Sequence, residues 1–232
     1  MRNFTQENLL HSETLGFDLS TLEQGTPNWH RSRAGVISAS KAHYLLMGRK
    51  TAGRQTYMNE LIASIATGLL PEEIKAKPLQ WGKDYEEMAG DAYSAATFET
   101  LESIGFIYRD NSMRSGCSPD SLIQGKPKGL ELKCPWSSSV FIDFAGNGNI
   151  KKEEVAQVDF SMWVTDYESW GFAKFDPRNV NCKKLHHVEV VRDQSKMDAI
   201  ENGYNEFIED MDLMLENMGL EFGMQWEQKE AQ

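Results

Sequence analysis

The sequence lacks the features that mark membrane, secreted or disulfide-stabilised proteins. No stretch approaches the roughly 20 consecutive apolar residues that span a bilayer. Residues 1–7 contain no apolar core of the kind found in secretion signals. The chain has only 3 cysteines in 232 residues, an odd number without the close spacing of a zinc site. We therefore expect free thiols and a cytoplasmic location.

A basic excess, which is usual in proteins that bind nucleic acid, is also missing. The formal net charge is −11, from 24 Lys and Arg against 35 Asp and Glu. The acidity is concentrated in residues 193–232, which carry 11 acidic and 2 basic residues. Residues 24–59 contain no acidic residue, and their basic residues are Arg31, Arg33, Lys41, Arg49, Lys50 and Arg54. This distribution allows a local positive surface, and the alternative is a solvated basic face without a ligand.

No internal repeat, low-complexity segment or long linker divides the chain, so we expect one domain. Residues 1–28 look peripheral because Pro27 and Asn28 form a turn signal, and residues 193–232 read as an acidic helix and tail. Apolar periodicity and capping signals predict helices from Ser38 or Ser40 to near Gly48 and over 54–67, 79–98, 137–146, 151–164 and 194–218. Short segments between turn residues predict strands at 103–109, 113–118, 120–124, 129–134, 168–175 and 185–191. Helices on both sides of a run of strands imply an α/β or α+β fold around one mixed sheet.

One segment has residues suited to phosphodiester chemistry. Asp120 is followed, after ten intervening residues, by Glu131, Leu132 and Lys133. Side chains alternate across a strand, so Glu131 and Lys133 lie on one face. A turn at 125–128 would place Asp120 opposite residues 131–133, within about one residue of register. Two carboxylates and an amine would then meet, although clustered carboxylates repel one another.

A divalent metal ion would relieve this repulsion. Mg²⁺ takes oxygen ligands from a few carboxylates, water and substrate phosphate. Two such ions about 4 Å apart can activate a water and stabilise the leaving oxygen of a phosphodiester. Lys133 would orient or deprotonate that water, or stabilise the developing charge. The spacing Asp–x(10)–Glu–x–Lys has the form of the PD-(D/E)xK nuclease signature. The alternative is a surface hairpin whose Glu–Lys pair contributes little.

Further segments, taken in order, resemble the lambda-type phage exonucleases of the YqaJ-like viral recombinase family. These enzymes are the nuclease half of a two-component viral recombination system. The resemblance runs from about Trp29 to Trp226. It is carried by Trp29-His30, residues 33–40, Trp81-Gly82-Lys83, Tyr85-Glu86, residues 107–110, 112–114, 117–120 and 130–135, Gln157, residues 161–164, Asp176-Pro177-Arg178, Phe222-Gly223 and Gln225-Trp226.

The resemblance assigns roles that spacing alone does not. It implies metal binding by the side chains of Glu86, Asp120 and Glu131 and by the Leu132 carbonyl; helical periodicity by itself cannot separate Asp84 from Glu86. It implies that Lys133 is the catalytic lysine and that Gln157 positions the water or the lysine. It also implies that Asp110 is an essential carboxylate that acts from behind the metal ligands. Without the resemblance, Glu86 would be interpreted as an exposed charge on a helix. Gln157 would be interpreted as a polar helix residue, and Asp110 as a turn residue.

The resemblance also implies a DNA-binding set. Arg33, Ser40 and Ser118 match residues that hold substrate phosphate, including the 5′-phosphate end. Trp29 would stack on a base, Leu79 would part the terminal base pair, and Arg31 completes the set. Each has an ordinary structural alternative, such as packing for Trp29 and Leu79 and a surface position for Arg33.

Two positions depart from the family's best-known member. Ser139, within the serine run 137–139, stands where that member has an arginine for the 5′-phosphate. This difference leaves dependence on a 5′-phosphate open. Phe160 stands in place of a tyrosine, and the lost hydroxyl could change how the helix is positioned without abolishing metal binding.

The expected fold is a restriction-endonuclease-like α/β core, with a central mixed sheet flanked by helices. The expected activity is 5′→3′ hydrolysis of one strand of duplex DNA, with two Mg²⁺ ions per site for which Mn²⁺ substitutes. The products would be 5′-mononucleotides and a 3′ single strand for a single-strand annealing protein. The resemblance further implies a homotrimeric ring around DNA, with basic segments inside and the acidic helix outside, in a phage- or prophage-encoded protein of the bacterial cytoplasm. The rival interpretations are a sequence- or structure-specific endonuclease on the same fold and an inactive module that binds DNA ends.

Overall fold

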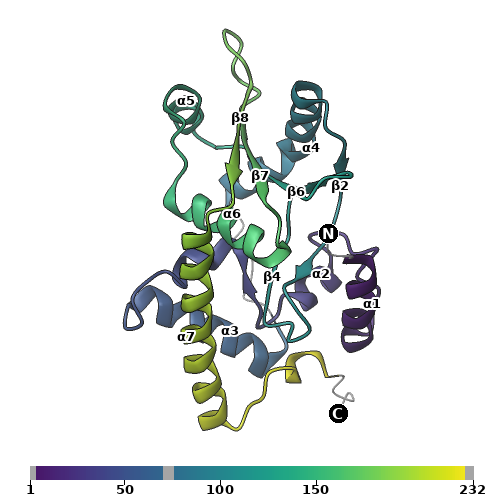
Figure 1. Cartoon of the computed structure of the whole chain (residues 1–232), viewed down its shortest axis with the longest axis vertical. Coiled ribbons are helices and arrows are strands. Elements are labelled where there is room, and N and C mark those ends of the chain that lie inside the picture. Colours follow the sequence, from purple (N-terminus) through teal and green to yellow (C-terminus); the bar gives the residue numbers. More distant parts are fainter. Residues whose placement is uncertain (1–3, 70–75, 228–232) are drawn as a thin grey trace.

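The computed structural model describes residues 4–69 and 76–227, which form helices around two small sheets (Figure 1). The α-helices are α1 (Phe4–Leu15), α2 (Pro27–Ser32), α3 (Ala52–Thr67), α4 (Lys77–Thr97), α5 (Ser138–Asn147), α6 (Lys152–Thr165) and α7 (Gln194–Met218). Two short 3-10 helices are η1 (Ala39–Tyr44) and η2 (Met224–Trp226). The strands are β1 (Ile37–Ser38), β2 (Leu101–Glu102), β3 (Ile107–Tyr108), β4 (Ser115–Cys117), β5 (Ser121–Ile123), β6 (Lys128–Lys133), β7 (Ser169–Phe175) and β8 (Leu185–Val191).

The larger sheet is the mixed sheet that the sequence predicts. Its strand order is β2-β5-β6-β7-β8, with β6 and β7 parallel and the other neighbours antiparallel. Leu130 and Leu132 point toward α4, where they pack with Ala89 and Tyr93. The opposite face carries Phe172, which packs toward α5 and α6. Helices therefore cover both faces, which confirms the expected α/β class.

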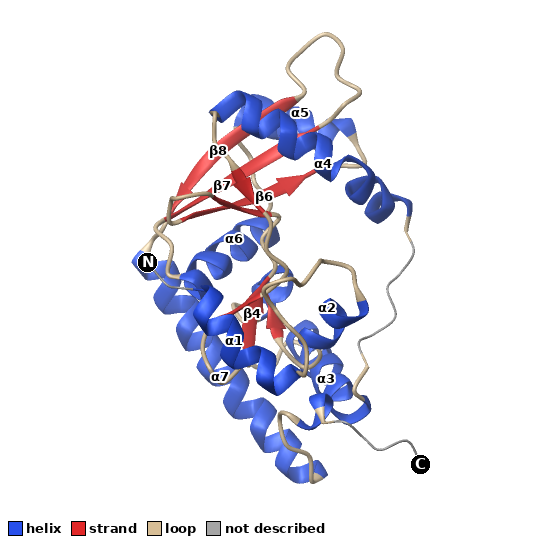
Figure 2. Ribbon diagram, turned by 90° about the vertical axis from the view of Figure 1, so that its right-hand side faces the viewer, coloured by secondary structure: helices blue, strands red, loops and turns tan. Residues whose placement is uncertain are grey.

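A second sheet, absent from the sequence prediction, lies below the first (Figure 2). Its order is β1-β4-β3, with β1 parallel to β4. The strand expected over 103–109 is extended only at its end, in β3. Gly105 lies so close to the α1–α2 connection that an added Cβ would be 2.2 Å from the Leu22 carbonyl oxygen. This segment therefore packs against the N-terminal region instead of continuing as a strand.

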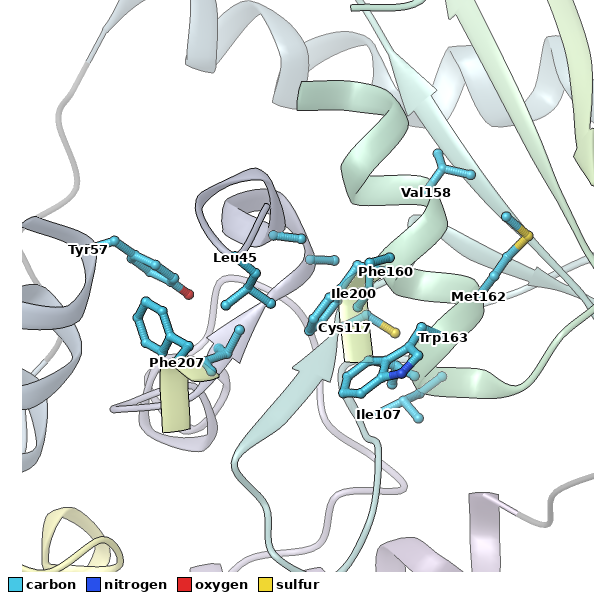
Figure 3. Packing of buried hydrophobic residues seen from close by; sticks show 14 of the residues in the cluster. Leu45, Tyr57, Ile107, Cys117, Val158, Phe160, Met162, Trp163, Ile200 and Phe207 are labelled. Carbon is cyan, nitrogen blue, oxygen red and sulfur yellow. The ribbon is translucent and has the colours of Figure 1, made fainter. Parts of the chain in front are cut away.

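Helix α6 occupies the space between the two sheets. Val158, Phe160, Met162 and Trp163 are all buried, although they point in different directions around the helix (Figure 3). A helix that is apolar on all sides belongs in a protein interior. Phe160 is 0% exposed and packs against Trp163, so no water reaches the position where the family's best-known member has a tyrosine.

The acidic helix α7 is held by arginines from distant parts of the chain. Arg49 and Arg54 both pair with Asp210, at 2.5 and 2.7 Å, and Arg114 pairs with Asp212. Two of the basic residues of the acid-free segment are thus neutralised within the molecule. Ion pairs that hold α7 in place therefore account for part of the charge asymmetry seen in the sequence.

The N-terminal segment and the cysteines complete the framework. Leu15 and Leu19 are buried in a second core with Phe106 and Tyr108, so residues 4–28 contribute to packing although they lie at the edge of Figure 1. All three cysteines are free, as the sequence predicts. None of the helices in the described part combines the length and apolar character that a bilayer crossing requires.

Candidate active site

The hairpin of β5 and β6 brings the three motif residues together. Ser121 pairs with Leu130 in antiparallel register, so Asp120 lies opposite Glu131. The Asp120 carboxylate accepts a hydrogen bond of 2.5 Å from the Leu132 backbone N–H. This bond fixes Asp120 over the end of β6, where the side chains of Glu131 and Lys133 point to the same face.

Glu131, Lys133 and Gln157 form a closed triangle of hydrogen bonds. The Lys133 Nζ lies 2.5 Å from Glu131 Oε1, and the Gln157 Nε2 donates to the same oxygen at 2.6 Å. The Lys133 ammonium also donates to Gln157 Oε1 at 3.2 Å. Glu131 is only 2% exposed, so these two donors replace the water that its charge would otherwise require.

The electrostatics of the cluster favour a protonated lysine. Burial acts to lower the pKa of the Lys133 amine, but the charges of Glu131 and Asp120 outweigh it and raise the pKa above its ordinary value. In this arrangement Lys133 is therefore an ammonium group. It can donate to a water or a phosphate oxygen, and it is not poised to remove a proton.

For the carboxyl groups of Asp120 and Glu86, the same surroundings disfavour the charged form. Burial, followed by the charge of Glu131, raises the pKa of Asp120 well above its ordinary value. Burial and the charge of Glu131 also raise the pKa of Glu86, which comes from α4. Both shifts mean that the ionised carboxylates are held in an environment that disfavours negative charge. A bound cation would remove this penalty.

The donor set fits a hard divalent cation in part. Asp120, Glu86, Glu131 and the Leu132 carbonyl offer only oxygen atoms, the ligands that Mg²⁺ and Mn²⁺ prefer. Within residues 4–69 and 76–227, however, no three His, Cys, Asp or Glu side chains form a complete metal-binding group. Glu131 is engaged by Lys133 and Gln157 instead. Such a partial set suits Mg²⁺, which keeps several waters and takes further ligands from a substrate phosphate.

A cleft of about 1230 Å³ lies beside this cluster and reaches Asp120, whereas Glu131, Lys133 and Gln157 are not among its lining residues. Six of the residues singled out in the sequence line it: Trp29, Arg33, Leu79, Glu86, Asp120 and Leu132. Two separate chain regions, α2 and α4, therefore meet the β5–β6 hairpin at one open space. The cleft leaves room for a substrate next to the carboxylates.

Residues from α2 and the end of β4 form one wall of the cleft. The Trp29 indole N–H donates to Ser118 Oγ at 2.9 Å, and the Arg33 guanidinium stacks on the Trp29 ring at 3.9 Å. Arg33 also lines a smaller cavity of about 260 Å³ together with Ser40 and Lys41. The structure thus brings Trp29, Arg33, Ser40 and Ser118 into one neighbourhood.

Two predicted residues do not join this group. The Arg31 guanidinium donates to the Trp226 carbonyl at 2.7 Å and so ties α2 to η2. Asp110 is exposed in the turn after β3, where it accepts the Ser112 N–H at 2.8 Å. Neither residue is among those that line the cleft.

Sequence reasoning missed several residues that line the cleft. Lys83, Glu87 and Asp91 project from α4 into it, on the same side as Leu79 and Glu86. The signal was available, because residues three or four apart share a helix face. Starting from Leu79, this spacing leads to Lys83, which brings a positive charge to a wall otherwise rich in acids.

Comparison with known proteins shows the family of the chain. The model of the YqaJ-like viral recombinase domain matches residues 28–168, more than half of the chain. A stretch of 77 residues, 33% of the chain, is 43% identical to a protein of Escherichia coli (strain K12) that carries the designation ExoD, and it spans 87% of that protein.

Solved structures share the architecture. An alkaline exonuclease from Laribacter hongkongensis, LHK-Exo, matches with a TM-score of 0.76 and 27% identity, over 84% of this chain and 96% of that chain. LHK-Exo in complex with dAMP matches equally well, over 83% and 96% of the two chains. A phage-related exonuclease from Haemophilus somnus 129PT, at 15% identity, shares the fold with a TM-score of 0.60, over 79% and 96%.

Together, the mixed sheet covered by helices and the match to LHK-Exo show a protein with the fold of the alkaline exonucleases. Within that class, the chain belongs to the YqaJ-like viral recombinase domain family.

Proposed function

We propose that this protein is a metal-dependent exonuclease that degrades one strand of duplex DNA from its 5′ end. The observation that carries the proposal is the Glu131–Lys133–Gln157 triangle with Asp120 beside it, next to an open cleft that Asp120, Glu86 and Leu132 line. LHK-Exo, which shares the fold at 27% identity, is named as an alkaline exonuclease and has a structure in complex with dAMP. That complex supports a nucleotide-binding role for a protein of this fold.

The residues of the cluster have different proposed roles. Asp120, Glu131, Glu86 and the Leu132 carbonyl would hold two Mg²⁺ ions, for which Mn²⁺ substitutes. Bound there, such ions lower the pKa of water and offset charge on a phosphodiester. The Lys133 ammonium donates to the attacking water or to a phosphate oxygen, and Gln157 holds Lys133 and Glu131 in register.

The walls of the cleft would hold the DNA end. Arg33, with Ser40 and Ser118 near it, offers cationic and hydroxyl donors for phosphate oxygens. Trp29 offers a ring for a base, although Arg33 already covers one of its faces. Leu79 is 47% exposed and lines the cleft, so its apolar side chain is available to contact a base pair.

Two further features belong to the same proposal. We infer that three copies of the 26.4 kDa chain form a ring around the duplex, and that the 3′ strand passes to a single-strand annealing protein in the bacterial cytoplasm. Both ideas come from the resemblance to the lambda-type phage exonucleases. Sedimentation that finds only monomers, with and without DNA, would contradict the ring.

The decisive experiment uses duplex DNA labelled at the 5′ end, with 5′-phosphate or 5′-hydroxyl termini, and closed circular DNA as a second substrate. With Mg²⁺, the wild type should release labelled mononucleotides and leave the circle intact. Lys133→Ala should bind DNA and release almost nothing. Cleavage of the closed circle would instead support an endonuclease. Binding of DNA ends without any Mg²⁺-dependent release would support an inactive end-binding module.

A further inference from the structure

The segment Asp176-Pro177-Arg178 follows β7, and none of its residues is among those that line the cleft. The Arg178 side chain is 39% exposed, which by itself would suit a surface arginine that meets DNA phosphates. Its hydrogen bonds indicate a different role. Four bonds already run from the five N–H donors of its guanidinium group to acceptors within the molecule.

Arg178 joins the ends of the two parallel strands β6 and β7. Its Nε and Nη2 donate to the two oxygens of the buried Asp176 carboxylate, at 2.8 and 3.0 Å, in the forked geometry that suits an arginine. Its Nη1 donates to the Trp136 carbonyl at 2.9 Å, and its Nη2 to the Pro135 carbonyl at 3.1 Å. These carbonyls come shortly after β6, which ends at Lys133. The chain beyond Lys133 is thus tied to the end of β7.

A further contact extends from Arg178 to α4. The guanidinium carbon lies 4.4 Å from the centroid of the Trp81 ring, and the Trp136 ring meets Trp81 edge to face at 5.6 Å. A cation over an indole ring is attracted by the negative face of the ring. Trp81 also packs on Tyr85, one turn later on the helix. The guanidinium group of Arg178 therefore connects β6, β7 and α4.

Trp81 anchors the first two turns of α4. Every residue of 77–84 is exposed except Trp81 and Gly82, which are half-buried. The buried residues of α4 begin only at Ala89. The start of the helix is therefore positioned mainly by the contacts of Trp81 and less by the core.

The contacts of Trp81 also control the direction in which Glu86 points. At about 100° per residue, Trp81 and Tyr85 lie on one flank of α4 and Glu86 on the other, with Ala89 between them. Contacts on the first flank fix the rotation of the helix about its axis, and the rotation sets the direction of Glu86. We propose that Arg178 is a positioning residue that, through Trp81, holds Glu86 in the cleft as a metal ligand. The inference rests on the proposed function, which assigns the metal to Glu86.

The test compares Arg178→Lys with the wild type in the full chain. A lysine keeps the positive charge but has no planar fork, so it cannot contact the carboxylate, the two carbonyls and the Trp81 ring together. Calorimetric titration with MnCl₂, without DNA, should show an affinity for the metal that is lower by about tenfold. Single-turnover release of a labelled 5′ nucleotide in Mg²⁺ should slow by about tenfold or more, because small displacements of catalytic groups are costly. DNA affinity in EDTA should keep its wild-type value.

Variants of Trp81 approach the same contact from α4 and leave the buried Asp176–Arg178 pair intact. Trp81→Leu should lower the affinity for Mn²⁺ by a similar factor. Trp81→Phe should retain most of it, because a flat ring still lies under the guanidinium group. In a double-mutant cycle, Arg178→Lys and Trp81→Leu should together cost less than the sum of their separate effects.

Two control variants separate positioning from other effects. Lys183→Arg, an equally conservative change at an exposed position between β7 and β8, should change nothing. Asp210→Ala removes the partner of the buried Arg54 and should lower the unfolding temperature without changing the affinity for Mn²⁺. Unchanged metal affinity in Arg178→Lys and Trp81→Leu, or an equal loss in Asp210→Ala, would overturn the positioning role. DNA affinity in EDTA that falls as much as the rate would make Arg178 a DNA contact instead.

The two proposals can fail separately. A wild type that binds Mn²⁺ with the expected dependence on Arg178 but releases no nucleotide would refute the exonuclease and leave the positioning role standing. A wild type that degrades DNA normally while Arg178→Lys keeps the full rate and metal affinity would refute only the positioning role.

Discussion

Replacement of Gln157 by leucine is expected to slow nucleotide release while leaving DNA binding nearly intact. Leucine has a similar size and suits a helix that is largely buried, so α6 should keep its place. What disappears is the amide that donates to Glu131 at 2.6 Å and accepts from Lys133 at 3.2 Å. The Glu131 carboxylate and the Lys133 ammonium group then lose the amide that contacts both of them.

The size of the effect follows from these hydrogen bonds. A hydrogen bond to a charged group contributes about 1.5–3 kcal/mol. If one such bond is needed only to reach the transition state, its removal slows the chemical step about 10- to 150-fold, because 1.36 kcal/mol corresponds to a factor of ten. Gln157→Glu should be slower still at neutral pH, because it places a second carboxylate where the amide now meets Glu131.

The assay is single-turnover release of a labelled 5′ nucleotide with protein in excess, and DNA affinity is measured separately in EDTA. A cycle with Lys133→Ala identifies the route. If Gln157 acts by positioning Lys133, the double variant should be no slower than Lys133→Ala alone. A Gln157→Leu protein with the full wild-type rate, or one whose affinity falls as much as its rate, would refute the positioning role.

Three further outcomes follow from the same structure. Asp120→Asn should abolish nucleotide release yet raise the free energy of unfolding at pH 7 by about 0.5–2 kcal/mol. The reason is that burial, followed by the negative charge of Glu131, raises the pKa of Asp120 above its ordinary value of 3.8 and so penalises the charged carboxylate. Calorimetry should show this gain vanish below pH 3.8, where the carboxyl is neutral in both states, and a variant less stable than wild type at pH 7 would contradict the reasoning. Asp210→Ala should lower the free energy of unfolding, measured in urea, by about 3 kcal/mol, because it leaves the buried Arg54 without its carboxylate partner. The hydrogen bond from Arg49 lowers the pKa of Asp210 below its ordinary value of 3.8. The stability that the Asp210 carboxylate contributes is therefore complete above pH 3.8 and is lost as the pH falls through the lowered pKa. EDTA should stop nucleotide release and added Mn²⁺ should restore it, whereas undiminished release in EDTA would exclude a metal requirement.

The part of the site that the sequence predicted is the part that local rules control. Side chains alternate along a strand, and the turn signal around Gly125, whose φ is 73°, sets the register of β5 against β6. These two facts were enough to place Asp120 opposite Glu131. The helix that carries Gln157 was also predicted nearly to its ends, over 151–164 against Lys152–Thr165 in the structure.

The position of α6 was harder to foresee, although its sequence held a signal. The polar residue Gln157 suggested an ordinary amphipathic helix. Val158, Phe160 and Trp163, however, cannot share one narrow face, which indicates burial on several sides. Between two sheets, α6 holds Gln157 rigidly over β6, and this rigidity is what the positioning role requires.

The second sheet and the outlying residues depended on long-range packing. β1 contains two residues and pairs with β4 through Ile37 and Ser115, and a strand this short has no periodicity to read. Arg31 finds its partner at Trp226, far along the chain, so no local pattern could have shown that it bonds there and does not line the cleft. Motif matching therefore named candidate residues without revealing that Arg31 would lie outside the cleft.

The acidity of the chain becomes understandable once the charges are placed. Part of the negative charge of helix α7 forms ion pairs with Arg49, Arg54 and Arg114 within the molecule. The cleft, in contrast, presents Asp120 and Glu86 to a substrate that is itself an anion. Without a cation this surface repels a phosphodiester, so the metal ions that we propose would serve binding as well as hydrolysis. Affinity that survives in EDTA must then come from basic side chains of the cleft wall, such as Arg33 and Lys83.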